Sequence, residues 1–328
     1  MNDSNVTDKL NGRISVVIPT YNLAAYIGRA IHSVLAQTRP ADEIIIVDDG
    51  SDDGTADIIT SYGVAVRYIV QENAGASAAR NAGITAARYE WIAFLDGDDE
   101  WLPEKLARQT ALIARNPHLN WVTGNFFLCE GPIRQDREKL PVDEGKKLLA
   151  GQDYFGDYFA AYNAGATGWT GTMVIRKEAL EQAGGFCVGQ KAANDLDMWW
   201  RIAYDHPQIG YVPEPLAKYH STIPDSITKK YRQPIILAEL LERHLDLSAQ
   251  KGQQEQFESC ARRMVQNRIH EYLLDERIGE VPEFLSRFGH ILPRKYQRRV
   301  RLLTLCPRVT SFLRPLLRWI NRYLRIPV

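Results

Sequence analysis

The sequence lacks three features that mark particular protein classes: close cysteine pairs, a long apolar run and an overall charge. Its 4 cysteines are far apart and form no Cys-x-x-Cys, which favours free thiols in a reducing compartment. No stretch approaches the ~20 apolar residues of a membrane-spanning helix. Residues 1–13 are polar, unlike the apolar core of a signal peptide. We therefore expect a cytoplasmic protein.

Charge is balanced overall but unevenly distributed. Lys and Arg number 40, as do Asp and Glu, so the whole chain is not expected to bind nucleic acid or another polyanion. Residues 294–328, however, carry ten Lys or Arg and no acidic residue. Arginines alternate there with Leu, Phe and Trp, which is typical of a basic amphipathic helix at an anionic membrane surface. The alternative is a helix pair packed on the protein with its arginines in solvent.

Short apolar runs alternate with helical patterns through the first part of the chain. Buried strands are predicted at residues 14–18, 43–47, 64–70 and 91–95. Helices are predicted at residues 23–37, 55–62, 74–88 and 103–116. This alternation predicts an α/β fold with helices on both faces of a parallel sheet. In such a sheet, ligands bind beyond the carboxyl ends of the strands.

The rest of the chain has weaker patterns. Residues 131–151 are charged and interrupted by Pro and Gly, which predicts a mobile loop. Strands are predicted at residues 172–176 and 216–219, and helices at 177–183, 195–204 and beyond about 230. We expect a flexible N-terminus at 1–13, an α/β domain at 14–228 and a helical region with a basic amphipathic tail at 229–328.

Acidic residues follow two of the predicted strands. Asp96, Asp98 and Asp99 would repel one another unless a cation neutralises them. Mg or Mn would do so and keep positions open for phosphate oxygens. Asp48 and Asp49 could accept a hydrogen bond from a nucleobase or a ribose. The alternative in both places is a turn or a helix cap, in which Asp is common.

Small residues surround Arg80 at the start of a predicted helix, in residues 73–83. The N-terminus of that helix would favour an anion, and Arg80 could face a nucleotide there. The alternative is close packing of the Ala and Gly residues, with Arg80 in solvent.

Four segments together resemble the motifs of family 2 glycosyltransferases. They are residues 16–22 (VVIPTYN), 46–51 (IVDDGS), 79–83 (ARNAG) and 94–99 (FLDGDD). They follow the family's order at similar spacing, and the resemblance covers about residues 14–226. It implies a GT-A-type, Rossmann-like domain that binds a nucleotide-diphosphate sugar, and inversion at the anomeric carbon.

The resemblance also implies roles for residues of the donor site. Pro19 and Tyr21 would line the base pocket, Asp49 would accept from a uracil or thymine imide with Asp48 nearby, Arg80 would contact the nucleotide, Asp96 would approach the ribose, and Asp98 would hold Mn or Mg on the diphosphate. The metal would neutralise the leaving diphosphate.

Inversion requires a base that deprotonates the acceptor hydroxyl. Residues 194–201 (NDLDMWWR) resemble the family's Glu-Asp-x-Asp segment, with Asn194 in place of the usual Glu. Asp195 matches the catalytic base by this resemblance, and Asp197 a structural residue. The alternative is that Asp195 only caps its helix.

Two further side chains are candidates by resemblance. Trp169 stands where the family forms its acceptor side and could stack on a sugar ring, although a core tryptophan is the alternative. His220, with Tyr219 before it and Ser226 downstream, resembles the Arg-x-His segment that closes over the diphosphate. A neutral imidazole would suit a manganese site, whereas a lone histidine is otherwise a core or surface residue.

These expectations together describe an inverting hexosyltransferase that moves a sugar from a UDP-sugar to a glycan hydroxyl. We expect it to act in surface polysaccharide synthesis at the inner face of the cell membrane, with a lipid-linked glycan as one possible acceptor. A nucleotidyltransferase or a Rossmann dehydrogenase would need a Gly-rich loop after the first strand, where residues 19–22 stand instead. A catalytically silent domain that binds a nucleotide sugar or a glycan is the remaining alternative.

Overall fold

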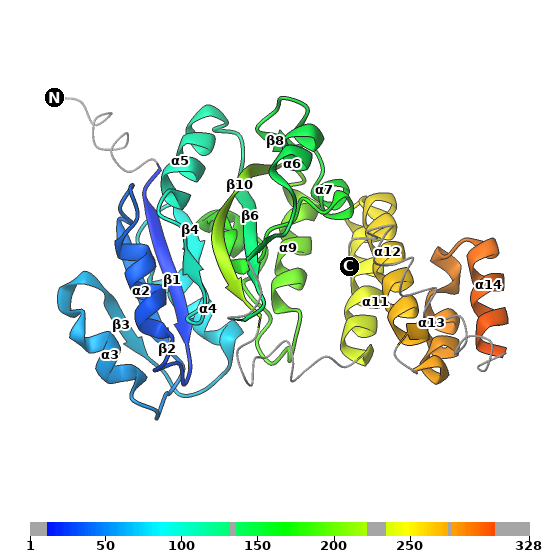
Figure 1. The fold of residues 1–328 in the computed structure, drawn as a ribbon, viewed down its shortest axis with the longest axis horizontal. Helices are drawn as coiled ribbons and strands as arrows, with labels where there is room; N and C mark the ends of the chain where they lie inside the picture. Colours follow the sequence, from blue (N-terminus) through cyan, green and yellow to red (C-terminus); the bar gives the residue numbers. More distant parts are fainter. Residues whose placement is uncertain (1–11, 132–135, 222–233, 275–276, 306–328) are drawn as a thin grey trace. The chain divides into compact units, whose positions relative to one another are not determined.

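The computed structural model describes residues 12–131, 136–221, 234–274 and 277–305 (Figure 1). The chain divides into two compact units, residues 1–236 and 237–328. The expected domain boundary at residue 228 and Ser226 lie outside the described residues. So do residues 1–11 and the part of the predicted basic tail after residue 305.

A mixed sheet of ten strands forms the centre of the first unit. Its main path is β3 (Arg67–Val70), β2 (Glu43–Asp48), β1 (Ile14–Thr20), β4 (Trp91–Phe94), β9 (Val174–Arg176), β6 (Trp121–Cys129), β10 (Ile209–His220) and β5 (Glu100–Trp101). Two short strands extend it, because β7 (Arg137–Glu138) pairs with β6 and β8 (Tyr154–Phe155) pairs with β10. Strands β1 to β4, β6 and β10 share one direction, and β9 runs against its neighbours β4 and β6.

Helices cover both faces of this sheet, as the alternating side chains of β1 illustrate. Val16 and Ile18 lie in a core shared with α2 (Ile27–Leu35), α3 (Thr55–Ser61) and α5 (Lys105–Arg115). Val17 meets α4 (Ala76–Ala86), where a Cβ on Gly83 would lie 2.3 Å from its Cγ1. Helix α9 (Asn194–Asp205) covers the β4 residue Phe94, whose ring is 6.3 Å from that of Trp199. The expected α/β architecture is confirmed.

All the candidate loops lie at one edge of the sheet. The parallel strands β1, β2, β4 and β10 end there. Because β9 runs the opposite way, it begins at that edge, and so the 3₁₀ turn η2 (Thr170–Thr172) before it lies there too. Segments far apart in the sequence therefore meet beyond the carboxyl ends of the parallel strands, where ligands bind in such sheets.

The middle of the chain is more regular than expected. The expectation of a loop over residues 131–151 is wrong for α6 (Val142–Leu149), which buries Leu149 in a small core of its own. Helix α7 (Tyr158–Ala164) is a further unexpected element, whereas α8 (Lys177–Gln182) confirms the helix expected at residues 177–183. The strand expected at residues 64–70 is shortened by the 3₁₀ turn η1 (Gly63–Ala65), which Gly63 opens with a φ of 54°.

The second unit is helical throughout its described residues, as expected beyond residue 230. It contains most of α11 (Pro234–Gln250), then α12 (Gln254–Leu274), η3 (Ile278–Glu280), α13 (Val281–Phe288), η4 (Gly289–Ile291) and α14 (Arg294–Leu305). Phe257, Ile269 and Phe288 are fully buried in it. Across the described parts of the chain, no helix combines the length and apolar character needed to cross a bilayer.

Candidate functional site

Three carboxylates crowd the loop that follows β4, as the sequence predicted. Asp99 is buried and accepts a 2.8 Å hydrogen bond from the backbone N–H of His220, which joins the loop to the end of β10. Burial and then the neighbouring Asp96 raise the pKa of Asp98 to about 6. Burial and then Asp98 raise the pKa of Asp99 well above its ordinary value. Such a group of acids favours the binding of a cation.

Arg80 neutralises one of these acids. From α4 its Nη2 lies 2.6 Å from Oδ1 of Asp96, and its guanidinium carbon lies 5.4 Å from the centre of the Phe186 ring. Arg80 is only 8% exposed, so the alternative of an arginine in solvent is wrong. Its buried Nε has no hydrogen-bond partner among the described residues, which leaves one donor for a ligand.

A second arginine, Arg29, was missed from the sequence. It extends from α2, and its Nη2 donates to the backbone carbonyl of Asp98. Burial and then the charge of Arg29 lower the pKa of His220. On the polar side of an amphipathic helix, nothing distinguishes such an arginine from one that faces water. Its role becomes apparent only in the folded structure, where α2 packs beside the loop that follows β4.

Both carboxylates after β2 hold the chain together. Asp49 is 3% exposed and accepts from Nε2 of Gln71 at 2.6 Å and from the backbone N–H groups of Ala74 and Gly75 at 2.9 and 2.7 Å. Asp48 is 1% exposed and accepts from Ser51 and from the Tyr68 hydroxyl. A carboxylate offers about four acceptor positions, so one position remains on Oδ2 of Asp49.

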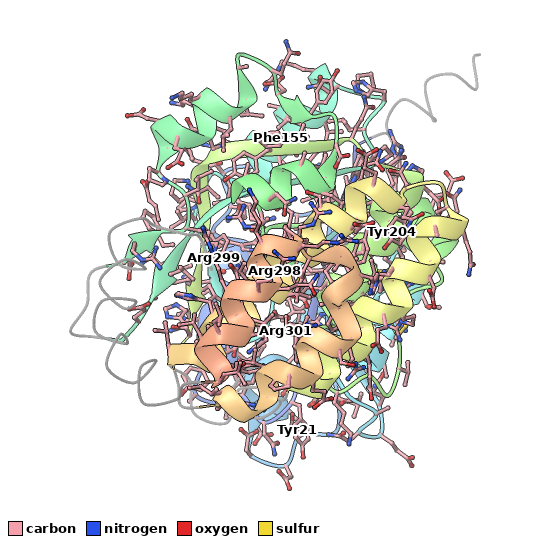
Figure 2. All side chains as sticks on the ribbon, turned by 90° about the vertical axis from the view of Figure 1, so that its right-hand side faces the viewer. Tyr21, Phe155, Tyr204, Arg298, Arg299 and Arg301 are labelled. Carbon is pink, nitrogen blue, oxygen red and sulfur yellow. The ribbon has the colours of Figure 1, made fainter. Side chains whose placement is uncertain are left out.

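The end of β1 contributes one exposed and one buried residue. Tyr21 is 48% exposed, and Figure 2 labels its position. Pro19 lies inside β1 opposite Val47, with its side chain buried in the sheet. After Tyr21, Asn22 adopts a left-handed φ of 51° and accepts a 2.9 Å hydrogen bond from the backbone N–H of Asp52. This bond joins the loops after β1 and β2.

Asp195 lies in the first turn of α9 near the same group of charges. Its Oδ1 accepts from the backbone N–H of Leu196 at 2.8 Å, and burial raises its pKa, with Arg80 opposing and Asp96 reinforcing the shift. Asn194 donates from Nδ2 to Oγ of Ser77 at 2.7 Å, which ties the start of α9 to α4. The structure therefore brings Asp195 together with the acidic loop.

The neighbouring Asp197 belongs to the framework. It is buried, and its Oδ2 lies 2.6 Å from Nη2 of Arg201. The same guanidinium donates to the backbone carbonyls of Ala183 and Gly185, so it fixes the segment between α8 and α9.

Trp169 and His220 lie on the other side of the acidic loop. The indole ring centre of Trp169 is 4.4 Å from that of Phe126 and 5.6 Å from that of Tyr219. Its N–H faces the Asp99 carboxyl group and opposes the burial that raises the pKa of Asp99, but it reaches no partner in hydrogen-bond geometry within the described residues. Nε2 of His220 lies 3.3 Å from Oε1 of Glu100.

A divalent ion fits Asp98 only with help from a ligand. Within the described ranges, no three His, Cys, Asp or Glu side chains are grouped so that they alone could hold a metal. Mg is commonly held by one or two carboxylates together with water and substrate phosphates. The carboxylate of Asp98 forms no ion pair with another described residue, and burial, followed by the charge of Asp96, raises its pKa. Those properties fit a metal that arrives with a diphosphate.

Comparisons with known proteins identify the family of the chain. The family model described as glycosyl transferase family 2 matches residues 15–184, about half of the chain. An uncharacterized glycosyltransferase of Nostoc, alr2836, is 46% identical over 180 residues, which is 52% of each protein. The putative teichuronic acid biosynthesis glycosyltransferase TuaG of Bacillus subtilis is 46% identical over 144 residues, 41% of this chain and 57% of TuaG. The chain thus spans little more than half the length of these relatives.

A solved structure shares the fold over most of the chain. The S. aureus protein TarS, as residues 1–349 in complex with UDP-GlcNAc, superposes with a TM-score of 0.67 at 20% sequence identity. The match covers 94% of this chain and 86% of that one. It confirms the GT-A-type architecture that the sequence motifs implied and the helical region expected after it.

Proposed function

Because this chain belongs to glycosyl transferase family 2, we propose that it moves a sugar from a UDP-sugar to a hydroxyl of a glycan, with inversion at the anomeric carbon. The observation that carries the proposal is that residues suited to three different tasks lie at the same edge of the sheet. Asp98 offers a cation site, Arg80 offers a free donor, and Asp195 offers a carboxylate whose pKa responds to Arg80 and Asp96. Their sequence separation makes a purely local explanation, such as turn formation, insufficient.

The nucleotide would lie over the loops that follow β1 and β2. Tyr21 has the exposure needed to stack on a base, and Asp49 keeps one acceptor position for an imide N–H. Asp48 and Pro19, which are both buried, would form the inner wall of this pocket. Asp96, held by Arg80, would approach the ribose. The UDP complexes of TarS, which shares the fold, support this choice of nucleotide.

A manganese or magnesium ion would bind with the diphosphate, held by Asp98 and by His220 from the end of β10. Such an ion supplies Lewis-acid stabilisation of the departing diphosphate. Arg80 would add charge-assisted hydrogen bonds to phosphate oxygens from the same side. Arg29 keeps the backbone of the acidic loop in place through the Asp98 carbonyl.

Asp195 would take the proton from the attacking hydroxyl. Its Oδ1 is held by the N–H of Leu196, so Oδ2 is the oxygen that would accept the proton. A raised pKa makes a carboxylate a stronger base, which suits proton abstraction near neutral pH. Trp169 would hold the acceptor sugar next to it by stacking on the sugar ring.

The acceptor class follows from relatives and from charge. TuaG bears a name from teichuronic acid synthesis, which supports a surface polysaccharide as the product here. We further propose that the basic helix α14 holds the enzyme at the anionic inner face of the cell membrane, where lipid-linked glycans would be met. Five basic side chains of α14 are exposed: Arg294, Lys295, Arg298, Arg299 and Arg301.

Calorimetric titration of a panel of nucleotide sugars in the presence of Mn tests the proposed function. We expect a UDP-sugar to bind more tightly with Mn than with a chelator, and to release UDP slowly. Binding without release of UDP under any condition would instead favour a silent nucleotide-sugar-binding domain. Absence of binding by every nucleotide sugar would overturn the proposal.

A further inference from the structure

A buried lysine lies close to the candidate site without taking part in it. Lys105 and Gln109, both on α5, have no exposed surface. Nζ of Lys105 donates to Oε1 of Gln109 at 2.8 Å and lies 3.9 Å from the centre of the Trp101 ring. Burial lowers the pKa of Lys105 well below its ordinary value. Complete burial is rare for lysine and costs free energy, so the arrangement calls for an explanation.

The two side chains that contact Lys105, those of Gln109 and Trp101, each donate a hydrogen bond to the backbone of the 3₁₀ turn η2. Nε2 of Gln109 donates to the backbone carbonyl of Thr172 at 2.7 Å. Nε1 of Trp101 donates to the backbone carbonyl of Gly171 at 2.7 Å. Because Lys105 can only donate, its contact with Oε1 fixes which end of the Gln109 amide points to Thr172. Two consecutive carbonyl groups of the turn are therefore fixed by buried side chains.

The position of the turn η2 determines where the indole ring of Trp169 lies. The backbone N–H of Trp169 donates to Oγ1 of Thr172 at 3.1 Å. A Cβ on Gly171 would lie 2.5 Å from Cζ2 of Trp169, so the indole folds directly over this glycine. Oγ1 of Thr172 is also 2.8 Å from Oγ1 of Thr123 on β6. Moving the turn would therefore move the indole.

The indole held in this way presents an unpaired donor to the acidic loop. Nε1 of Trp169 is buried and lacks a hydrogen-bond partner within the described residues, although it faces Asp99. Trp101, only two residues after Asp99, belongs to the same short segment as the proposed metal ligand Asp98. One end of this segment faces the donor site, and the other end supports the turn that carries Trp169.

We infer that Trp101, Lys105 and Gln109 form a buried clamp that positions Trp169 for the acceptor sugar. This inference rests on the acceptor role proposed above for Trp169. The three clamp residues are positioning residues, because they act through the backbone of η2 and contact no reacting atom. A lysine is suited to the task because its ammonium group both stacks on Trp101 and orients Gln109.

The variant Gln109→Glu tests the clamp. It keeps an acceptor for Lys105 and adds an opposite charge, but it loses the N–H group that donates to Thr172. Fluorine NMR of protein labelled with 5-fluorotryptophan, with the signal assigned through Trp169→Phe, reports the position of Trp169 directly. We expect the Trp169 signal to shift or split, while that of Trp199 on α9 stays unchanged.

Two further variants separate positioning from general stability. Gly171→Ala should displace the same Trp169 signal while leaving the side chains of Trp101, Lys105 and Gln109 unaltered, and Gln182→Glu, an exposed exchange on α8, should leave it unchanged. UDP affinity in Gln109→Glu should stay within about twofold of the parent, a difference below ~0.5 kcal/mol. If Gln109→Glu does not fold, Lys105→Met, which releases the Gln109 amide, is expected to give the same shift.

Two results would overturn the clamp. One is an unchanged Trp169 signal in Gln109→Glu, or in the Lys105→Met replacement, while Gly171→Ala does shift it. The other is a loss of UDP affinity together with the Trp169 shift, since the residues would then support the whole site. If the parent protein binds no UDP, the proposed function fails, whereas the Trp169 signal still decides whether the clamp exists.

Discussion

At the scale of single residues, Asp98 differs from Asp96 because it forms no ion pair with another described residue. We expect Asp98→Asn to lower UDP release by roughly a hundredfold or more, the scale of a lost electrostatic contribution to the transition state. The fold should persist, because the change removes repulsion from Asp96 and Asp99. Steady-state rates with Mn and circular dichroism check both statements. Full activity of the parent in a chelator would contradict the role of a metal.

Asp195 should affect rate and stability in opposite directions. Asp195→Asn should keep UDP affinity but reduce turnover by roughly 10²–10⁴, the usual contribution of a general base. Because burial raises the pKa of Asp195 in the folded protein, ionising it weakens folding as the pH rises through that pKa. The variant should therefore be at least as stable as the parent at neutral pH in denaturant titrations. Parental turnover in the variant would refute the assignment.

The same shift predicts a pH dependence of activity. A base must be ionised to work, so kcat/KM should fall as the pH decreases through the raised pKa of Asp195. The acid limb should lie above ~3.9, the ordinary value for aspartate. A profile measured at saturating Mn gives this limb. An acid limb at or below the ordinary value would show that another group takes the proton.

Asp49 is expected to act on the nucleotide both directly and through residues 71–75. Asp49→Ala should weaken UDP binding by about 1–3 kcal/mol, since it removes an acceptor and leaves the N–H groups of Ala74 and Gly75 unpaired. Asp52→Ala, on the same loop but exposed, provides the control. Equal UDP affinity of Asp49→Ala and the parent in calorimetry would exclude Asp49 from base recognition.

At the scale of elements, the strands that are buried on both faces are the easiest to predict from the sequence. Strands β1, β2 and β4 are buried on both faces, so they appear in the sequence as continuous apolar runs. Strand β6 was missed because Thr123 and Asn125 interrupt its apolar pattern. Asn125 is fully buried and donates to the carbonyls of Leu140 and Pro213, partners that no local pattern indicates. Strand β10 was recognised only at its end, because Pro213 and Pro215 disturb its register.

The candidate site shows the same division between local and distant information. Asp98, Asp99 and Asp195 were identified because short motifs at strand or helix ends carry them. Arg29 and Lys105 were not, because a basic residue in a helical pattern normally faces water. Their roles depend on the packing of α2 and α5 against the acidic loop and η2, which the sequence does not encode locally.

Helix α9 depends on a buried ion pair that can be tested separately from catalysis. Arg201→Met would break the buried ion pair with Asp197, and breaking such a pair typically costs about 3–5 kcal/mol. The control Arg115→Met removes an exposed pair with Asp153 and should cost at most ~1 kcal/mol. Denaturant titration compares the two. Equal losses of stability would show that Arg201 does not anchor the start of α9.

At the scale of the whole molecule, α14 stands apart by its charge. Several other arginines of the second unit form ion pairs, as in Arg262–Glu258 and Arg287–Glu242. The basic residues of α14, three of which are labelled in Figure 2, form no ion pair within the described residues. Leu302 and Leu305 on the same helix are 67% and 76% exposed. This combination supports binding to an anionic membrane surface.

Replacement of Arg298, Arg299 and Arg301 by Gln tests the membrane proposal while preserving the buried Val300. Each basic residue near an anionic surface contributes about 1 kcal/mol, so binding to phosphatidylserine vesicles should fall roughly a hundredfold at low salt. UDP affinity should not change. If the parent protein does not bind these vesicles at low salt, α14 has a structural or assembly role and the membrane proposal fails.

The proposed reaction is the cleavage of a nucleotide-diphosphate sugar. It requires a metal held by Asp98 and the base Asp195, which lie at the same edge of the sheet. Release of UDP from a panel of UDP-sugars, compared between the parent and Asp195→Asn with Mn present, tests it most directly. We expect the parent to release UDP from at least one of them, and the variant to bind the same sugar nucleotide but to release UDP at least about a hundredfold more slowly. Equal release by the two proteins, or no release by the parent from any of them, would contradict it.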